Sequence, residues 1–339
     1  MTKVICKWAG LLILLLPVAL PCSAQAPAAY KYFRTGNAAD AHVTPRAGYA
    51  LMGGGTDLDE AFLWLCGRAN GGDLLVVRAT GTDAYNPYIQ RLCHLNSVAT
   101  LVIPTREAAS NPFVEKTIHH ASAIFIAGGD QANYINFWEH TPVQTALNEA
   151  IARGVPMGGT SAGLAVMGEW SYSAQGDKPD DPNLDSKTAL SDPDGRRVTL
   201  VRRFLDIPIL KDVVADTHFA RRDRMGRLLV FLARANSANP SAAPGVRGIG
   251  VEEGAAVLVE PGGQATVVGR GSAYFIERDF ELKFYSGVRP LHGLVAATVQ
   301  KVAPGHSFHL KTWTGDATRY SLSVKDGVID STQADRAIY

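Results

Sequence analysis

An excess of charge of one sign is absent from this sequence: 33 lysines and arginines face 32 aspartates and glutamates, for a formal net charge of +1. Nonspecific nucleic-acid binding needs a surplus of cations, so the composition argues against it and we expect no nucleic acid as partner. Internal repeats and low-complexity tracts are also missing. With 46% hydrophobic and 19% charged residues, the 339-residue chain has ordinary globular proportions and can bury a large core.

Long apolar runs are scarce, and the run at residues 11–20 is too short to span a bilayer comfortably. Lys3 and Lys7 precede it and small residues follow, which is the layout of a signal peptide. We expect residues 1–24 to be cleaved off, because Pro27 would hinder a cut two residues further on. Since no later run resembles a membrane helix, we expect a soluble mature chain with no membrane partner, secreted or periplasmic.

Cysteine is rare, with four residues in the chain. Cys6 and Cys22 leave with the signal peptide; a lipoprotein role for Cys22 is the weaker alternative, since Pro21 stands where a small residue is expected. Cys66 and Cys93 remain, an even pair in an oxidising compartment. We predict that they form a disulfide, with two buried free thiols as the alternative.

Short apolar runs alternate with helical patterns over the first half of the chain. The runs cover residues 48–52, 74–78, 98–103, 123–127 and 155–158, and the helical patterns cover 58–69, 87–95, 112–120 and 131–153. Strands alternating with helices predict βαβ units and a parallel sheet, whose strands are apolar on both faces. We therefore predict an α/β fold with a doubly wound, mostly parallel sheet.

Residues 171–197 interrupt this alternation, because they are rich in Asp, Ser, Pro and Gly, and we expect a loop there. The sheet resumes at 213–215, a helix is expected at 221–235, and short β-type runs dominate after it. We assign residues 25–280 to an α/β domain and residues 281–339 to a β-rich C-terminal extension. This extension either continues the domain or forms a small module of its own.

A candidate nucleophile follows the last of the early strands. Residues 159–163 read Gly-Thr-Ser-Ala-Gly, which fits the G-x-S-x-G pattern between a strand and a helix. Small neighbours allow the strained turn that exposes Ser161 at the carboxyl end of the sheet, where ligands bind in open α/β folds. The N–H of Ala162, at the start of the next helix, can face a developing oxyanion. A phosphate-binding or merely tight turn is the alternative.

A serine nucleophile needs a base, and the base needs an orienting carboxylate. His218 is the best placed of nine histidines, because it follows the strand at 213–215 and so lies at a carboxyl end. Glu252 and Glu253 end a later strand and give the chain order Ser, His, Glu. Asp216 would share a face with His218 in a strand, so it is a rival orienter or a substrate contact.

Four motifs in one order resemble a known family. They are Gly-Gly-Asp-Gln at 128–131, the serine motif at 159–163, Asp-Thr-His-Phe at 216–219 with Arg222, Arg224 and Arg227 after it, and Gly-Ile-Gly-Val-Glu-Glu at 248–253. Together they resemble the cyanophycinases, in the serine peptidase family shared with aspartyl dipeptidases. The resemblance implies a class I glutamine-amidotransferase-like fold in which serine replaces the usual cysteine.

The resemblance also implies roles for single residues. It makes Ser161 the nucleophile, His218 the base and Glu253 the orienting acid, and it implies neither a metal nor an organic cofactor. The oxyanion N–H groups would come from Gly129 and Ala162. The residues that fall in the family's substrate-binding motifs are Gln131, Asp216, Thr217, Arg222, Arg224 and Arg227. Thr217 departs from the family, which usually has glutamine before the histidine.

Cyanophycinases cleave a polymer with a poly-aspartate backbone and arginines on its side-chain carboxyls, and they release β-aspartyl-arginine dipeptides. A secreted serine exopeptidase acting on such a polymer is therefore the first hypothesis. An aspartyl or isoaspartyl dipeptidase, or another serine hydrolase on this fold, is the second, and a non-catalytic binding protein is the third. The expected partner is a peptide polymer or dipeptide, and a homodimer is left open.

The loop at 171–197 carries six aspartates, and we expect them to line the mouth of the pocket, where they would meet substrate guanidinium groups. They are Asp177, Asp180, Asp181, Asp185, Asp192 and Asp194. Ordinary turn chemistry of Asp beside Pro and Gly is the alternative.

Overall fold

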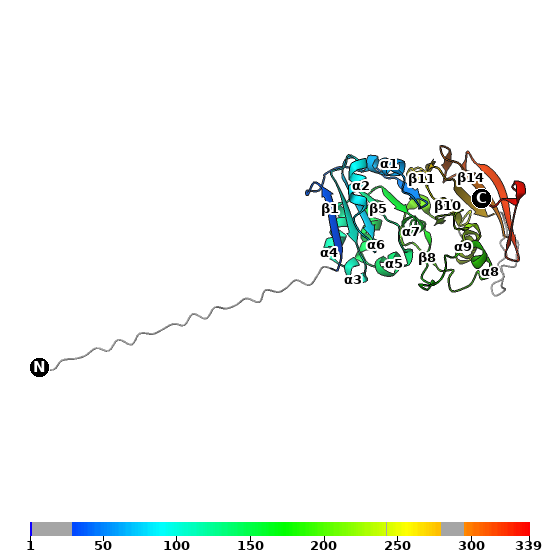
Figure 1. Cartoon of the computed structure of the whole chain (residues 1–339), viewed down its shortest axis with the longest axis horizontal. Coiled ribbons are helices and arrows are strands. Elements are labelled where there is room, and N and C mark those ends of the chain that lie inside the picture. Colours follow the sequence, from blue (N-terminus) through cyan, green and yellow to red (C-terminus); the bar gives the residue numbers. More distant parts are fainter. Residues whose placement is uncertain (2–28, 242, 279–294) are drawn as a thin grey trace.

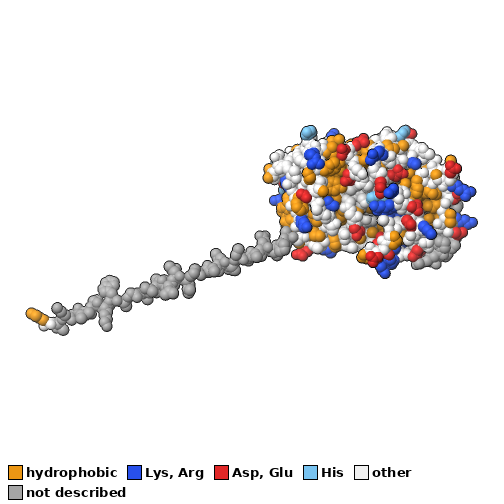
Figure 2. All heavy atoms as spheres, viewed as in Figure 1, with side chains coloured by type: hydrophobic (Ala, Val, Ile, Leu, Met, Phe, Trp, Pro, Cys, Tyr) orange, Lys and Arg blue, Asp and Glu red, His pale blue; other side chains and the backbone are white. Residues whose placement is uncertain are grey.

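The computed structural model describes residues 1, 29–241, 243–278 and 295–339. The predicted signal peptide, apart from Met1, and the predicted domain boundary at residue 280 lie outside these residues. The described strands form two sheets with helices packed against them, and α7 lies near the middle of the molecule (Figure 1). Acidic and basic side chains are interspersed over the face drawn in Figure 2.

The first sheet has ten strands in the described part of the chain, in the order β1-β4-β3-β5-β6-β2-β11-β12-β15-β16. Its central strands β4, β3, β5, β6 and β2 pair in parallel, which confirms the predicted parallel sheet. The strands are β1 (Lys31–Gly36), β2 (Tyr49–Met52), β3 (Asp73–Arg78), β4 (Ser97–Val102), β5 (Ala123–Ile126), β6 (Met157–Thr160), β11 (Ala255–Val259), β12 (Gln264–Gly269), β15 (Ser307–His309) and β16 (Thr314–Gly315).

The second sheet has eight strands among the described residues, in the order β18-β17-β14-β13-β10-β9-β7-β8. The strands are β7 (Trp170–Tyr172), β8 (Leu200–Arg202), β9 (Val213–Asp216), β10 (Arg247–Val251), β13 (Ala273–Arg278), β14 (Val295–Val302), β17 (Thr318–Lys325) and β18 (Val328–Ser331). β7, β9 and β10 run parallel to one another. The C-terminal strands pair with both sheets, since β14 pairs with β13 and β15 pairs with β12.

The helices connect these strands. They are α1 (Asp59–Ala69), α2 (Tyr85–Leu92), α3 (Arg106–Ala109), α4 (Pro112–His120), α5 (Gln131–Trp138), α6 (Pro142–Ala152), α7 (Ala162–Ala165), α8 (Ser186–Ser191) and α9 (Met225–Ala238), with the short 3-10 turns η1 (Pro208–Leu210) and η2 (Ala334–Arg336). No helix in the described ranges is both long enough and apolar enough to cross a membrane.

Local sequence explains several helix starts. Asp130 caps α5 by accepting the N–H of Ala132, and Asp185 caps α8 in the same way through Thr188. The helix α8 lies inside the segment predicted to be a loop. The helix predicted at 221–235 begins only at Met225, because the chain first makes a tight turn in which His218 and Asp223 have positive φ angles of 47° and 46°.

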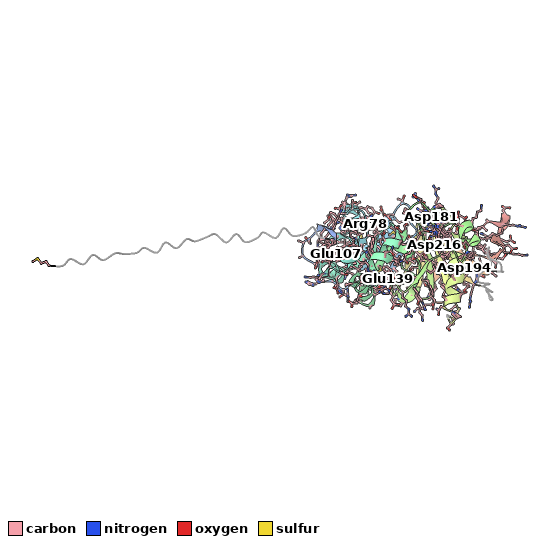
Figure 3. All side chains as sticks on the ribbon, turned by 90° about the horizontal axis from the view of Figure 1, so that it is seen from below. Arg78, Glu107, Glu139, Asp181, Asp194 and Asp216 are labelled. Atoms are coloured by element: carbon pink, nitrogen blue, oxygen red, sulfur yellow. A yellow bond between two sulfur atoms is a disulfide. The ribbon has the colours of Figure 1, made fainter. Side chains whose placement is uncertain are left out.

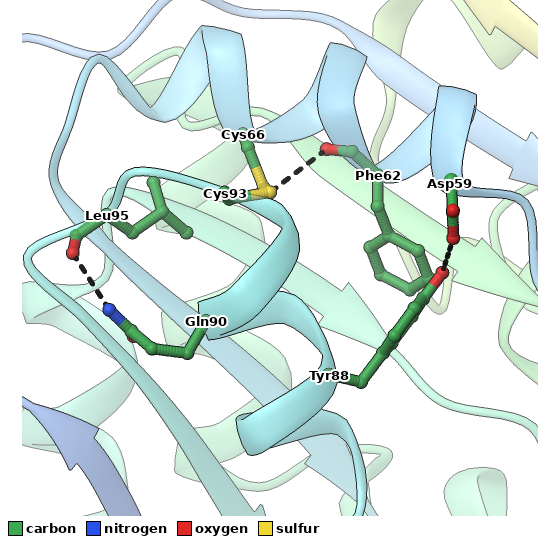
Figure 4. Close-up of a disulfide and its surroundings, with 7 residues drawn as sticks. All are labelled: Asp59, Phe62, Cys66, Tyr88, Gln90, Cys93 and Leu95. Atoms are coloured by element: carbon green, nitrogen blue, oxygen red, sulfur yellow. Dashed lines mark hydrogen bonds between the residues drawn. A yellow bond between two sulfur atoms is a disulfide. The ribbon is translucent and has the colours of Figure 1, made fainter.

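The predicted disulfide is present between Cys66 on α1 and Cys93 at the end of α2 (Figure 4). Both cysteines are buried, and the pair closes a loop with a sequence separation of 27 residues. The Tyr88 hydroxyl donates to Asp59, and the Tyr88 ring packs edge-on against Phe62. The disulfide and these contacts therefore fasten α2 to α1.

Removing this disulfide should lower the free energy of unfolding by roughly 3 kcal/mol, because a cross-link of this loop length restricts the unfolded chain. The measurement is chemical denaturation of the wild type and of the Cys66→Ala/Cys93→Ala variant. Alkylation of the native protein with mass detection is the control. An unchanged denaturation midpoint, or two thiols that react without reductant, would contradict the expectation.

Candidate active site

Ser161 occupies the sharp turn between β6 and α7, with φ of 52° and ψ of −119°. A non-glycine residue with such angles is strained and persists only where its surroundings hold it. Close packing around the turn does so, because a Cβ at Gly163 would lie 2.0 Å from the carbonyl oxygen of Ile126. The turn is the strand–Ser–helix elbow that the G-x-S-x-G pattern predicts.

His218 follows β9 and is also held by its backbone. Its N–H donates to the carbonyl of Gly53 at 2.8 Å, and the residue is 5% exposed. A Cβ at Gly54 would lie 2.5 Å from the imidazole Cε1, so the loop after β2 is pressed against the ring. The glycines after β2 therefore position the histidine, a role that the sequence analysis did not assign to them.

Three side chains form a hydrogen-bonded relay. The Ser161 hydroxyl lies 2.7 Å from His218 Nε2, and His218 Nδ1 lies 2.6 Å from Glu253 Oε1. With the proton on Nδ1 facing the carboxylate, Nε2 is free to accept the serine proton. Glu252 is turned away, because it accepts hydrogen bonds from the N–H of Ser272 and the hydroxyl of Tyr274.

The surroundings shift both ionisable members of the relay. Burial lowers the pKa of His218 below its ordinary value, and Arg222 and Arg224 lower it further, although the hydrogen bond to Glu253 acts in the opposite direction. The hydrogen bond from His218 lowers the pKa of Glu253. The imidazole is therefore neutral, and the carboxylate ionised, at neutral pH.

A pocket of about 190 Å³ opens beside Ser161. It brings together Gly129, Gln131, Ala162, Thr217, Arg222, Arg224 and Arg227, all of which the sequence analysis singled out. It also includes Asp130 from the motif at 128–131 and Asp177 from the acidic loop. Four further lining residues come from β7 and the segment after it and were not singled out: Tyr172, Ala174, Asn183 and Leu184. No local pattern marks Tyr172 or Asn183, since only the tertiary fold brings the end of β7 and the segment after it to this edge.

Asp216 lies behind the pocket instead of in it. Its carboxylate accepts from Arg227 Nε at 2.8 Å and Nη2 at 2.5 Å, and both residues are 2% exposed. Burial acts to raise the pKa of Asp216, but Arg227 and Arg224 more than offset it and lower that pKa. The expectation that Asp216 orients His218 or contacts substrate is therefore corrected: it anchors Arg227.

Thr217 fixes Arg224. The Arg224 Nη1 group donates to the Thr217 carbonyl at 2.8 Å and to its hydroxyl at 3.0 Å. Burial, with Arg227 next in effect, lowers the pKa of Arg224 to about 9, which still leaves it protonated at neutral pH. Arg222 is exposed at the rim, within 3.4 Å of Asn183 Oδ1. Two guanidinium groups, those of Arg227 and Arg224, thus lie against the buried carboxylate of Asp216, and Arg222 lies further out at the rim.

The structure agrees only partly with the expectation that the aspartates of the acidic loop line the pocket. Of its six aspartates, Asp177 is the one that lines the pocket, where it accepts from the Tyr172 hydroxyl and from Arg197 Nε. Asp181 pairs with Arg196 within the loop. Figure 3 labels Asp181, which is half-buried, and Asp216, which is buried. Asp185 caps α8, so turn and capping chemistry accounts for it.

The described residues contain no group of three or more His, Cys, Asp or Glu side chains that could hold a metal ion. The active-site pocket is lined by polar and charged side chains, and the nucleophile, the base and the carboxylate come from three different strand ends. This is the arrangement expected of an enzyme that acts on a charged substrate.

Comparison with known proteins places the chain. Residues 50–267, more than half of it, match the model of peptidase family S51. Cyanophycinase from Synechococcus elongatus is 28% identical over 66% of this chain and 65% of its own length, and cyanophycinase from Nostoc sp. strain PCC 7120 is 29% identical over 53% of each. The chain thus spans about half to two thirds of the curated relatives' length.

The crystal structure of a peptidase from an acI-B1 Actinobacterium is 16% identical to this chain. It shares the fold with a TM-score of 0.50, over 78% of this chain and 98% of its own. The chain belongs to peptidase family S51, a family of serine peptidases.

Proposed function

We propose that this protein is a secreted serine exopeptidase that hydrolyses cyanophycin-like polymers to β-aspartyl-arginine dipeptides. The observation that carries the proposal is the relay from Ser161 through His218 to Glu253, with successive distances of 2.7 Å and 2.6 Å. A non-catalytic binding protein has no need of a serine hydroxyl directed at a neutral, buried imidazole.

In the first half of the reaction, the Ser161 oxygen attacks the scissile carbonyl carbon while His218 Nε2 accepts the serine proton. The negative charge moves to the carbonyl oxygen, where the N–H groups of Gly129 and Ala162 would stabilise it. The carbon–nitrogen bond then breaks, and His218 gives its proton to the leaving amine. An acyl-enzyme ester on Ser161 and a free amino group result.

In the second half, water attacks the ester while His218 accepts its proton. The ester bond breaks, and the proton returns to the Ser161 oxygen as the carboxylic acid product leaves. Glu253 remains ionised throughout and stabilises the imidazolium that forms twice in the cycle.

The charge of the pocket supports a zwitterionic substrate. Each repeat unit of the polymer carries a free carboxylate and a guanidinium group. Arg222 and Arg224 offer donors for the carboxylate, because a planar guanidinium can bind it with two hydrogen bonds. Asp130 and Asp177 line the same pocket and offer acceptors for the guanidinium.

A secreted or periplasmic location is part of the proposal. The disulfide between Cys66 and Cys93 supports it, because such bonds persist in oxidising compartments. The predicted signal peptide supports it from the sequence alone.

An aspartyl or isoaspartyl dipeptidase is the second candidate, and Thr217 favours it. Thr217 stands where the resemblance expects glutamine. Threonine has no side-chain amide with which to contact substrate, and its hydroxyl and carbonyl already accept hydrogen bonds from Arg224. Incubation of the purified protein with cyanophycin and with Asp-X dipeptides, followed by mass identification of the products, decides between the two. Release of β-aspartyl-arginine supports the first candidate, and cleavage of the dipeptides alone supports the second.

Replacing the nucleophile or the base should abolish turnover. Ser161→Ala and His218→Ala should each lower kcat by about 10⁴-fold or more, because the two groups act as a unit. Steady-state kinetics on cyanophycin measures the effect, and an unchanged thermal midpoint shows that each variant is folded. Near-normal turnover by either folded variant would remove that residue from the mechanism.

The two neighbouring glutamates should differ. Glu253→Gln should lower kcat by about 10⁴-fold, because the imidazole loses the partner that fixes its tautomer. Glu252→Gln should instead lower thermal stability and leave kcat nearly unchanged, since Glu252 bonds Ser272 and Tyr274 and not the histidine. The reverse pattern would assign the orienting role to Glu252.

The pH profile should report the lowered pKa of His218. Activity requires the neutral imidazole, so kcat/KM should rise with pH through a midpoint below 6.5, the ordinary histidine value. Arg222→Gln should move this midpoint upward, because one nearby cation is lost, while the matched Arg221→Gln change should move it less. A wild-type midpoint above 6.5 would contradict the electrostatics described for the site.

A further inference from the structure

A second pocket, of about 440 Å³, lies at the same carboxyl edge of the first sheet. It is lined by Asp57, Arg78, Gly81, Thr82, Ala84, Tyr85 and Tyr88. Asp57 belongs to the loop after β2, Arg78 is the last residue of β3, and the two tyrosines are on α2. The active-site pocket is lined from other elements, so this one is separate from it.

The second pocket adjoins the nucleophile turn. The sheet order β3-β5-β6-β2 places the β6 end, which leads into Ser161, between the strand ends that supply Arg78 and Asp57. The Asp57 carboxylate accepts from the Tyr85 hydroxyl at 2.7 Å and from the side chain of Thr160, the residue before Ser161. The second pocket is therefore linked to the nucleophile turn through Thr160.

Arg78 brings a rigid positive charge to this pocket. Its Nε donates to the Thr80 carbonyl at 2.6 Å and its Nη1 to the Thr82 carbonyl at 3.0 Å, so its own turn holds it. Gly81 leaves room for the guanidinium, because a Cβ there would lie 2.5 Å from Arg78 Cζ. The side-chain hydrogen bonds given for Arg78 among the described residues go to these two carbonyls and to no carboxylate, which leaves its charge available to an anion.

The aromatic part of the pocket suits a cation. The rings of Tyr85 and Tyr88 line the pocket, and an aromatic face attracts a guanidinium group. Arg78 itself lies over the Tyr85 ring, with its Cζ 5.9 Å from the ring centroid, so Tyr88 is the ring left for a guanidinium from substrate. The hydroxyls of Tyr85 and Tyr88 donate to Asp57 and Asp59, which places a carboxylate at the tip of each ring. Burial raises the pKa of Asp57, although the Tyr85 and Thr160 hydroxyls bond to it. The pocket thus offers one site for a carboxylate and one for a guanidinium.

We propose that this pocket is a second substrate subsite, in which Arg78 binds the arginine carboxylate of the adjacent repeat unit and Tyr88 receives its guanidinium. The inference rests on the proposed cyanophycin-like substrate and adds where the unit on the other side of the scissile bond lies. It makes Arg78 a specificity-determining residue outside the Ser161–His218–Glu253 relay.

The test uses a two-unit substrate, which spans the scissile bond, and two analogues in which one or the other arginine carboxylate is converted to the amide. Arg78→Gln should raise KM for the parent substrate about tenfold with little change in kcat, because a hydrogen bond to a charged group is lost. Arg78→Lys should recover part of the loss. Arg106→Gln is the matched control, since the Arg106 guanidinium also donates to backbone carbonyls, those of Asn136 and Glu139, away from the pocket.

For one of the two amide analogues, wild-type and Arg78→Gln proteins should have the same KM, because the group that Arg78 binds is already missing. An equal KM loss on all three substrates, or no loss on any, overturns the subsite. Wild-type KM values that are the same for all three substrates overturn it without any variant. Folded wild-type protein that cleaves none of them overturns the proposed function, and the subsite with it.

Discussion

The candidate active site depends on a backbone junction between the two sheets. The N–H of His218, at the end of β9, donates to Gly53 at the end of β2, and the N–H of Gly53 donates to Ala255 at the start of β11. This junction presses the glycine loop against the imidazole and fixes where the ring can stand. Glu253 lies in the turn between β10 and β11, so the same junction brings the carboxylate to the histidine. Without it, the nucleophile on one sheet would have no base.

A buried ion pair and the arginines around it set the charge of the site. The bidentate pair of Asp216 and Arg227 is almost completely buried, and removing one partner from such a pair strands the other charge at high cost. Arg224 and Arg222 extend the positive charge from this pair toward the pocket mouth. The same cations help to keep His218 neutral. In the proposed function, one arginine cluster would thus serve both to attract a substrate carboxylate and to maintain a competent base.

Much of this could be predicted from the sequence. The buried parallel strands read as continuous apolar runs, and the G-x-S-x-G pattern marked Ser161, because both signals are local. The anchoring role of Asp216 was not predictable, since its partner Arg227 lies eleven positions further on and only the turn before α9 brings them together. Tyr172 and Asn183 were missed for the same reason. Too many aspartates of the 171–197 segment were expected at the pocket, because a composition rich in Asp does not distinguish helix capping and ion pairs from ligand contacts.

The disulfide has a consequence beyond the stability of the fold. It joins α1, which carries Asp59, to the end of α2, which carries Tyr85 and Tyr88, so it braces one wall of the second pocket. The proposed relay lies on other strand ends, and among the described residues no cysteine lines the pocket beside it. A thiol reductant would therefore loosen the wall while the relay stays assembled. Under the subsite proposed above, the redox state of the surroundings would then change how the second pocket holds the adjacent repeat unit, with the bond-breaking chemistry at Ser161 left intact.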